Sequence, residues 1–368
     1  MKVLLACGGT GGHIFPAVAI AKALQAQDPS CEILFLGAEY GMEKKLIPQE
    51  GFRLETIEVT GLSRSNPLAA ARSLAQAARG LLRARSLIKQ FNPDLAIGTG
   101  GYVSGPAILA AALLGIPTMI HEQNAFPGLT TRILARFASV VAVSHEAAIA
   151  RLPQARRIVV TGLPIRPAFY QMDKAQARAK MGLPPEAVVI LAVGGSGGAL
   201  RLNEAISQAA PHLLTKQELV LLQITGERYY DNVITVAKSL GWPTVWSNRW
   251  QIIRFMHDMP AALAAADLVI SRAGASTLEE IAAVGVPAIV IPSPNVTDNH
   301  QEHNARALAA QGAAVIILDH LLTAKNLLST IDGLLRNPAQ LETMAQASKS
   351  ASHPQATADL VDLALSLL

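Results

Sequence analysis

Short apolar runs that alternate with helical patterns recur through the sequence, and they constrain its fold more than any other feature. Each run is bounded by Gly, Pro or Asp, and its apolar residues are continuous rather than alternating. This pattern predicts strands buried on both faces, as in parallel sheets with crossover helices. The predicted strands are 3–7, 32–36, 95–98, 118–121, 140–143, 158–161, 188–193, 219–225, 244–246, 268–271, 288–291 and 314–317.

The strand series restarts near residue 188, which predicts two domains. Between the two series, the segment 162–167 contains Pro164 and Pro167, which disfavour regular structure. A chain of 368 residues is also too long for one compact domain. We predict an α/β protein with two doubly wound, Rossmann-like domains, 1–162 and 163–344, that face each other across a cleft. The terminal segment 345–368 is predicted to be helical and to pack on either domain.

A glycine cluster follows the first predicted strand of each domain. Residues 8–13 read GGTGGH and residues 194–198 read GGSGG, and a helical pattern follows both. Glycines let the backbone approach a ligand, and a helix N-terminus offers N–H groups and a positive dipole end to an anion. Ile14 and Leu200 stand where a dinucleotide fingerprint has its third glycine, and neither cluster is a P-loop. The repetition favours one mononucleotide-type ligand over two loops that only connect strand to helix.

Further polar clusters follow other predicted strands, at the edge where the carboxyl ends of a parallel sheet gather. They read HEQN at 121–124, SRAGASTLEE at 271–280 and DNHQEHN at 298–304. His13 is either a structural residue at the helix start or a neutral general base. Glu280 is either an exposed carboxylate favoured by the helix dipole or an acceptor for both hydroxyls of a ribose.

Metal chemistry is not predicted. His300 and His303 form a pair, but no third ligand at a convincing spacing accompanies them. Cys7 and Cys31 are too few and too far apart for a disulfide framework or a metal motif, which fits a reducing cytosol.

Positive charge is concentrated in one stretch. Between Glu58 and Asp94 the chain has no acidic residue, although its overall net charge is only +4. On a helical wheel Arg72, Arg79 and Arg83 fall on one side, with apolar residues roughly opposite. This helix either packs only on its own domain or also contacts anionic lipid or an anionic partner.

No membrane span or signal peptide is predicted. Residues 95–120 carry no charge, but their glycines and prolines suit strand, loop and helix better than one spanning helix. The apolar run after Met1 is too short for a signal peptide.

In order and spacing, the sequence resembles the MurG family of UDP-N-acetylglucosamine transferases of peptidoglycan synthesis. The resemblance extends to about residue 310 and rests on GGTGGHIFPAVAIA, GGYVSGPA, HEQN, GGSGGA followed by LN, SRAGASTLEEIAAVGVPAIVIP, and DNHQEHNA. It implies a GT-B fold and an inverting, metal-independent transfer without a cofactor. The donor would be UDP-N-acetylglucosamine, and the acceptor the 4-hydroxyl of undecaprenyl-diphosphate-linked N-acetylmuramoyl-pentapeptide, so that lipid I becomes lipid II.

The resemblance also implies a cellular context. The enzyme would be cytoplasmic, would bind peripherally to the anionic inner face of the cell membrane, and would serve cell shape and division. No nucleic acid partner is implied. Arg72, Arg79 and Arg83 are the expected membrane contacts.

On the acceptor side, the resemblance makes His13 the leading candidate for the base, with Glu122 and Tyr102 beside it. On the donor side, Glu280 would bind the ribose and Met256 would offer its backbone to the uracil. The other substrate-binding residues it implies are Thr10, Gly11, Gly12, Asn124, Arg166, Ser196, Ala275, Ser276, Thr277, Leu278, His300, Gln301 and Asn304.

The sequence departs from the family pattern at three positions. Gly197 and Leu200 stand where some members have Gln and Arg, and His300 stands where some have Gln. The sequence therefore does not predict whether this chain makes the side-chain contacts to the phosphates and the sugar that those members make. The alternatives are another GT-B enzyme that uses a UDP-sugar, with a different lipid acceptor or as an epimerase, and a two-lobed binding protein without catalysis.

Overall fold

The computed structural model describes residues 1–59, 67–195, 197–246 and 248–368, with side chains from residue 76 onward in the helix that begins at Pro67. The chain forms two compact units, Met1–Ile165 with His353–Leu368, and Arg166–Ser352. The sequence placed this boundary between residues 162 and 163. The segment 345–368 is divided between the units, because one helix ends at Ser350 and another begins at Ala356.

The first unit contains a parallel sheet whose strands lie in the order β3-β2-β1-β4-β5-β6-β7. The strands are β1 (Lys2–Cys7), β2 (Glu32–Ala38), β3 (Arg53–Ile57), β4 (Leu95–Gly100), β5 (Thr118–Glu122), β6 (Val140–Val143) and β7 (Ile158–Val160). Its helices are α1 (Gly11–Gln27), α2 (Glu43–Gln49), α3 (Pro67–Phe91), α4 (Ser104–Leu113), α5 (Leu129–Leu134), the 3₁₀ helix η1 (Glu146–Arg151) and α15 (Ala356–Leu365).

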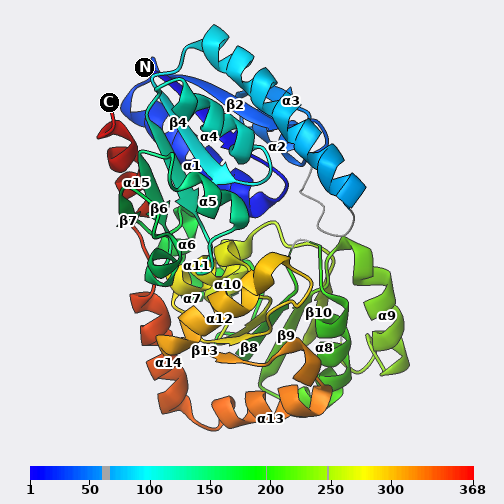
Figure 1. The fold of residues 1–368 in the computed structure, drawn as a ribbon. Coiled ribbons are helices and arrows are strands. Elements are labelled where there is room, and N and C mark those ends of the chain that lie inside the picture. Colours follow the sequence, from blue (N-terminus) through cyan, green and yellow to red (C-terminus); the bar gives the residue numbers. More distant parts are fainter. Residues whose placement is uncertain (60–66, 196, 247) are drawn as a thin grey trace. The chain divides into compact units, whose positions relative to one another are not determined.

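The second unit contains another parallel sheet, in the order β10-β9-β8-β11-β12-β13 (Figure 1). The strands are β8 (Val188–Val193), β9 (Leu219–Ile224), β10 (Trp250–Ile253), β11 (Leu268–Ser271), β12 (Ala288–Val290) and β13 (Ala314–Ile316). The helices are α6 (Ala168–Gln171), α7 (Lys174–Lys180), α8 (Leu200–Leu213), α9 (Tyr230–Ser239), α10 (Met259–Ala265), α11 (Ala275–Val284), α12 (His300–Ala310), α13 (Ala324–Leu335) and α14 (Pro338–Ser350), with 3₁₀ helices η2 (Glu227–Tyr229), η3 (Thr297–Asn299) and η4 (Asp319–Leu321). The predicted pair of parallel-sheet, Rossmann-like units is confirmed.

Strand β1 illustrates why the predicted strands are continuously apolar. Side chains of a strand point alternately to opposite faces. In β1, Val3, Leu5 and Cys7 pack with α1 and α15, whereas Leu4 and Ala6 pack with α3 and α4 on the other face. Both faces are therefore covered by helices, and each apolar residue of the strand is buried. The chain's last helix completes one of these layers.

One predicted strand is wrong, and one strand at the edge of the first sheet was not predicted. Residues 244–246 form turns rather than a strand, since Val245 N–H donates to the carbonyl of Gly241, and the strand of this region begins at Trp250. Strand β3 was not predicted; it reads RLETI and lies at the edge of its sheet. An edge strand pairs on one side only and carries polar residues, so the search for continuous apolar runs passed over it.

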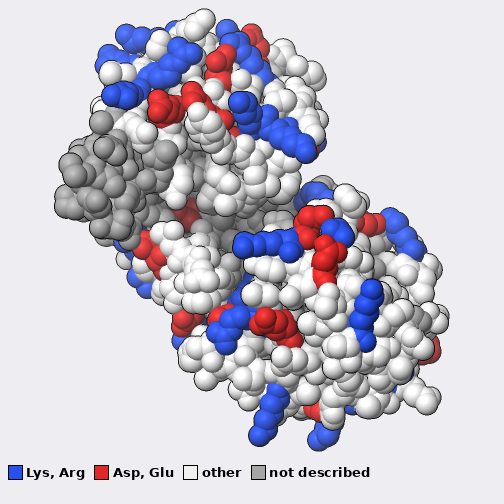
Figure 2. Space-filling view, turned by 90° about the vertical axis from the view of Figure 1, so that its right-hand side faces the viewer, with Lys and Arg blue, Asp and Glu red and all other residues white. Residues whose placement is uncertain are grey.

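The surface reflects a composition with only 16% charged residues. On the face seen in Figure 2, side chains of Lys and Arg and of Asp and Glu stand singly or in small groups among uncharged residues. Among the described residues, no helix is both long and apolar enough to cross a membrane.

Candidate functional site

Each sheet has one point at which the direction of strand succession reverses. In the first unit β1 lies between β2 and β4, and in the second unit β8 lies between β9 and β11. Loops that follow strands on either side of such a point diverge and leave room for a ligand at the carboxyl ends of the strands. The two glycine clusters follow β1 and β8, so each unit presents its cluster at this point.

The first glycine loop is held against the loop that follows β4. Gly101 has a φ of +80°, and a Cβ there would overlap the carbonyl of Gly8, so these backbones approach as only glycine allows. Thr10 is the N-cap of α1 through its carbonyl, which accepts from the N–H groups of His13 and Ile14 at 3.1 and 3.2 Å. The Thr10 side chain makes no capping bond. Gly11 and Gly12 form the first turn of α1, where backbone N–H groups have no partner within the helix.

The His13 ring lies against the end of β4. Its Nδ1 atom is 3.1 Å from the carbonyl oxygen of Thr99 and 3.1 Å from Oε1 of Gln123. Thr99 Oγ1 donates to the carbonyl of His13 at 2.7 Å, which ties the start of α1 to the same strand. A Cβ at Gly100 would lie 2.6 Å from Nδ1, so the ring packs directly on the backbone.

Gln123 and His121 form a buried group behind His13. Gln123 Nε2 donates to the carbonyl of Thr99 at 2.7 Å and to that of His121 at 3.1 Å, and it lies 3.2 Å from His121 Nδ1. His121 Nε2 is 3.0 Å from the carbonyl oxygen of Gly162. Burial lowers the pKa of His121 to about 4, so its imidazole is neutral near pH 7.

Glu122 is buried, and both of its carboxylate oxygens are engaged. Oε1 accepts from the backbone and side-chain nitrogens of Asn124, each at 3.0 Å. Oε2 accepts from Gly128 N–H at 3.0 Å and from Thr131 Oγ1 at 2.6 Å. The carboxylate therefore fixes the loop after β5 and orients Asn124. Tyr102, in the turn after β4, is 58% exposed.

Glu43 was not predicted as a site residue, yet its carboxylate supports the first glycine loop. It is fully buried on α2, and its oxygens accept from Gly9 N–H at 3.1 Å and Ala38 N–H at 2.9 Å. Side chains at the nearby glycines 8, 37 and 41 would overlap it. Burial, and to a lesser degree the Glu43 charge, raises the pKa of the Cys7 thiol, which is thus kept unreactive.

The second glycine loop is closed on the loop after β9. Gly198 has a φ of +73°, and a Cβ at this position would overlap the carbonyl of Thr225. Asn203 Nδ2 donates to that same carbonyl at 2.9 Å, which ties α8 to the end of β9. Ser196, a predicted phosphate contact, lies outside the described residues.

The start of α11 combines a helix N-terminus with a carboxylate and a guanidinium. Gly274 is the N-cap and offers no side chain, so the first N–H groups of the helix, at Ala275, Ser276 and Thr277, have no helical acceptor. Leu278 is buried, and its N–H donates to the carbonyl of Gly274 at 3.0 Å.

Glu280 lies one turn into this helix. Burial raises its pKa to about 7, against the opposing effect of the Arg166 charge. Arg166 is exposed and stacks on the Phe169 ring, 5.0 Å from its centroid. Helix, carboxylate and guanidinium together could receive a phosphate and a pair of hydroxyls. Met256, half-buried in the segment after β10, offers backbone groups.

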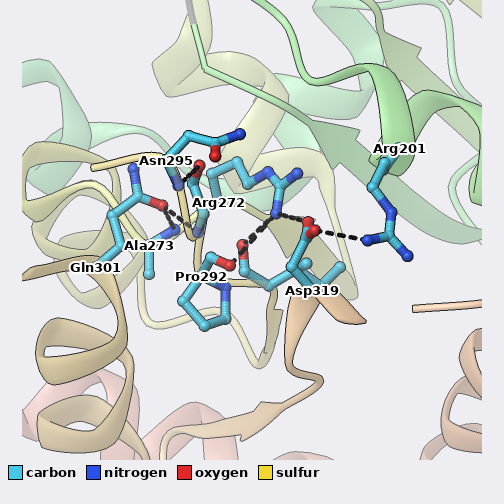
Figure 3. A network of polar contacts seen from close by, with 9 residues as sticks. Arg201, Arg272, Ala273, Pro292, Asn295, Gln301 and Asp319 are labelled. Atoms are coloured by element: carbon cyan, nitrogen blue, oxygen red, sulfur yellow. Dashed lines mark hydrogen bonds and ion pairs between the residues drawn. The ribbon is translucent and has the colours of Figure 1, made fainter. Parts of the chain in front are cut away.

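A network of polar contacts holds the loops after β11 and β12 (Figure 3). Arg272 Nη1 pairs with Asp319 at 2.6 Å and donates to the carbonyl of Ile291 at 3.1 Å. Arg201, from α8, pairs with the other oxygen of Asp319 at 3.0 Å. The side chains of Arg272 and Asp319 are only 13% and 8% exposed, so the pair is weakly screened by solvent. The sequence did not single out either residue.

The network sets the orientation of Gln301 on α12. Its Oε1 accepts from Ala273 N–H at 3.2 Å, as Figure 3 shows, and from Ser293 N–H at 2.9 Å. The amide nitrogen is thereby the group left to donate toward a ligand. Asn304 is fully buried and donates to the carbonyl of Ala273 at 3.3 Å, so it supports the loop. His300 begins α12 and its Nδ1 lies 2.8 Å from the carbonyl of Thr297.

The basic helix predicted near residue 80 is α3. Ala84, Leu87 and Ile88 are buried on its inner face. Arg79 and Arg83 are exposed, and Leu82 between them is 67% exposed. The Arg72 side chain lies outside the described residues. Within the described part of the chain, no three His, Cys, Asp or Glu residues are grouped as a metal site requires.

Both units match known families. The glycosyltransferase family 28 N-terminal domain matches residues 3–143, and the C-terminal domain of that family matches residues 189–360. The chain is 44% identical over 363 residues to the UDP-N-acetylglucosamine–N-acetylmuramyl-(pentapeptide) pyrophosphoryl-undecaprenol N-acetylglucosamine transferase of Caldanaerobacter subterraneus, with 99% of both chains covered.

Two solved structures illustrate the range of the fold. The crystal structure of MurG from Acinetobacter baumannii matches with a TM-score of 0.80 and 33% identity, covering 99% of both chains. A UDP-N-acetylglucosamine 2-epimerase from Neisseria meningitidis matches with a TM-score of 0.69 over both whole chains, at 14% identity. The second likeness concerns the fold alone.

Glu280 makes a pH-dependent contribution to stability. Its pKa of about 7 lies above the ordinary 4.5, so the folded unit keeps a proton that the unfolded chain has released. The free energy of unfolding therefore falls as pH rises through this window. We expect Glu280→Gln to raise the free energy of unfolding at about pH 8 and to change it little at about pH 4.5, as measured by urea denaturation.

The matched control is Glu204→Gln, which replaces an exposed carboxylate on α8 of the same unit. Its effect on the free energy of unfolding should be small at both pH values. A stabilisation by Glu280→Gln that is equal at both would contradict the assignment.

Proposed function

The chain belongs to glycosyltransferase family 28 and to its N-acetylglucosamine transferases of peptidoglycan synthesis, and on this premise we propose how its residues perform the reaction. The enzyme transfers N-acetylglucosamine from UDP-N-acetylglucosamine to lipid I, the undecaprenyl-diphosphate-linked muramoyl-pentapeptide. The observation that carries this function is the similarity to transferases of this one activity along 99% of both chains. This sequence similarity extends over both units, whereas the similarity to the epimerase is one of fold alone.

The donor is assigned to the second unit. The N–H groups at the start of α11, the glycine loop with Ser196, and Arg166 bind the diphosphate. Glu280 accepts the ribose hydroxyls, and Met256 offers its backbone to the uracil. Negative charge grows on UDP as it leaves, and these groups stabilise it as a metal ion would. The residues assigned to the sugar are Thr10, Gly11, Gly12, Asn124, Gln301, His300 and Asn304, the last acting through the loop that it supports.

The acceptor is assigned to the first unit, with His13 as the base. His13 takes the proton of the acceptor 4-hydroxyl as that oxygen attacks C1 of the sugar. The bond from C1 to the β-phosphate oxygen breaks on the opposite face, and UDP leaves with the electron pair, which inverts C1. Glu122 acts through Asn124, because its carboxylate accepts from Asn124 and from Gly128 and Thr131 farther along the same segment. Tyr102, which is exposed in the turn after β4, contacts the acceptor.

A membrane surface is the proposed location of the acceptor, reached from the cytoplasm. Arg79, Leu82 and Arg83 share one face of α3, since residues three and four apart are neighbours on a helix. An exposed leucine between two arginines suits a surface of apolar chains and anionic headgroups. Synthesis of the cell-wall precursor at this surface would serve cell shape and division.

The transfer is tested with radiolabelled UDP-N-acetylglucosamine and a lipid I analogue. We expect label to move to the lipid at the same rate with and without EDTA, because helix N-termini and Arg166 replace a metal. Label that remains on the nucleotide would reject the function. A requirement for added divalent metal would reject the metal-free mechanism alone.

His13→Ala tests the base in the same assay. General base catalysis contributes about 10²- to 10⁴-fold to the rate, so we expect kcat to fall by about this factor. The KM for UDP-N-acetylglucosamine should stay within about twofold, since donor binding is assigned to other residues. An unchanged kcat would reject His13 as the base.

The membrane assignment is tested with vesicles that contain anionic lipid. At about 1 kcal/mol per cation, the double variant Arg79→Glu and Arg83→Glu should lower vesicle affinity by about 30-fold or more. Turnover of a soluble acceptor should be retained. The control is Lys44→Glu with Lys45→Glu, the same change of charge on exposed positions of α2. Equal loss of binding in both double variants would assign the effect to net charge rather than to α3.

A further inference from the structure

We propose that Gln123 is a positioning residue that holds His13 in the tautomer with its proton on Nδ1 and its lone pair on Nε2, and that His121 holds Gln123 in turn. The inference rests on the proposed function of His13 as the base and names the atom that accepts the proton. The chain of contacts runs from Gly162 through His121 and Gln123 to His13.

The orientation of the Gln123 amide follows from two carbonyl groups. Nε2 lies 2.7 Å from the carbonyl oxygen of Thr99 and 3.1 Å from that of His121. A carbonyl oxygen only accepts, so the amide nitrogen must face these two groups. The reverse orientation would place Oε1 against two other oxygens. The amide oxygen therefore points to His13.

This orientation determines the tautomer of His13. Its Nδ1 atom lies 3.1 Å from Gln123 Oε1 and 3.1 Å from the Thr99 carbonyl oxygen. Both partners accept, so Nδ1 must be the donor of the neutral imidazole, and the lone pair is on Nε2. When Nε2 takes a proton, the charge spreads to Nδ1, where both oxygens already accept.

His121 completes the chain with the opposite tautomer. Its Nε2 is 3.0 Å from the carbonyl oxygen of Gly162 and therefore carries the proton. Its Nδ1, 3.2 Å from Gln123 Nε2, is left as an acceptor. Burial lowers the pKa of His121 to about 4, which agrees with a neutral ring that accepts at Nδ1. Of the two N–H groups of Gln123 Nε2, one donates to the Thr99 carbonyl and the other is shared between the carbonyl and Nδ1 of His121.

The packing of the ring adds to this constraint. His13 lies so close to Gly100 that a Cβ there would be 2.6 Å from Nδ1. Its own backbone carbonyl accepts from Thr99 Oγ1 at 2.7 Å, so the helix start and the ring are tied to the same strand end. Rotation of the ring would break both bonds of Nδ1 at once.

Nitrogen NMR determines the tautomer of His13 without an activity measurement. In protein labelled with ¹⁵N-histidine and held near pH 8, we expect a pyridine-type signal for His13 Nε2 and a pyrrole-type signal for Nδ1. A His13→Asn variant assigns these signals by their loss. A pyridine-type Nδ1 in the unsubstituted protein would overturn the proposal.

Gln123→Met tests the positioning role, because methionine has a similar length but no amide. We expect the two His13 nitrogen signals to move toward each other as the tautomers mix, and kcat to fall about tenfold or more while both KM values stay within about twofold. The control is Gln27→Met, the same substitution at an exposed position at the far end of α1, the helix that carries His13. Unchanged nitrogen signals together with an unchanged kcat would overturn the proposal.

Two variants of His121 separate positioning from packing. Asn places an oxygen near the site of Nδ1 and still accepts from Gln123, whereas Leu fills space without accepting. We expect His121→Asn to retain more of kcat and of the His13 signal separation than His121→Leu. Equal loss in both would overturn the role of His121.

The assignment of His13 as the base and the proposal that Gln123 sets its tautomer can be rejected separately. If His13→Ala keeps its kcat, the proposed base is wrong, while the nitrogen signals still report whether Gln123 sets the tautomer. If the signals show a protonated Nε2, the tautomer proposal is wrong even when His13→Ala is inactive.

Discussion

The close approach of two backbones at the carboxyl ends of β1 and β4 is the constraint on which the site of the first unit depends. Gly8 and Gly101 pack so tightly that a Cβ at Gly101 would overlap the Gly8 carbonyl. This contact brings the start of α1 beside the ends of β4 and β5, where Thr99 and Gln123 meet the His13 ring. A side chain at Gly101 would separate these elements, and the ring would lose both partners of Nδ1. The glycines therefore set the distance at which a histidine and a strand end can exchange hydrogen bonds.

Buried polar side chains then hold each loop in place. Glu43 fixes the turn at Gly9, and Glu122 fixes the loop after β5, each through backbone N–H groups. In the second unit the Arg272–Asp319 pair does the same for loops after β11 and β12. A buried polar group that loses its partner costs about 1–3 kcal/mol, so these bonds are costly to break. Rigid strand ends and fastened loops keep ligand groups in place before a ligand arrives.

Much of this arrangement could be predicted from the sequence, for identifiable reasons. Buried parallel strands produce continuous apolar runs, and polar residues directly after such runs gather at one edge, which predicted the place of the segment 121–124. His13 was singled out by the glycine cluster and helix start that follow the first strand. Glu43 and Asp319 escaped prediction because their partners are distant in the sequence, as for Glu43 and Gly9. Glu122 was expected to face the acceptor, yet its bonds are to its own loop, since a strand-end carboxylate finds backbone N–H groups within a few residues. A sequence pattern does not show which hydrogen-bond partner a side chain will reach in the folded protein.

The return of α15 to the first unit bears on how the chain folds during synthesis. The same core contains β1, α1 and four residues of α15, so it joins segments that lie before and after the second unit in the sequence: Leu360, Val361, Leu363 and Ala364. The second unit is an insertion between them, continuous from Arg166 to Ser352. A ribosome makes all of the second unit before it makes α15, and domains tend to fold as their residues emerge. Of the two units, the one whose first segment is translated earlier is therefore the one whose core is completed later.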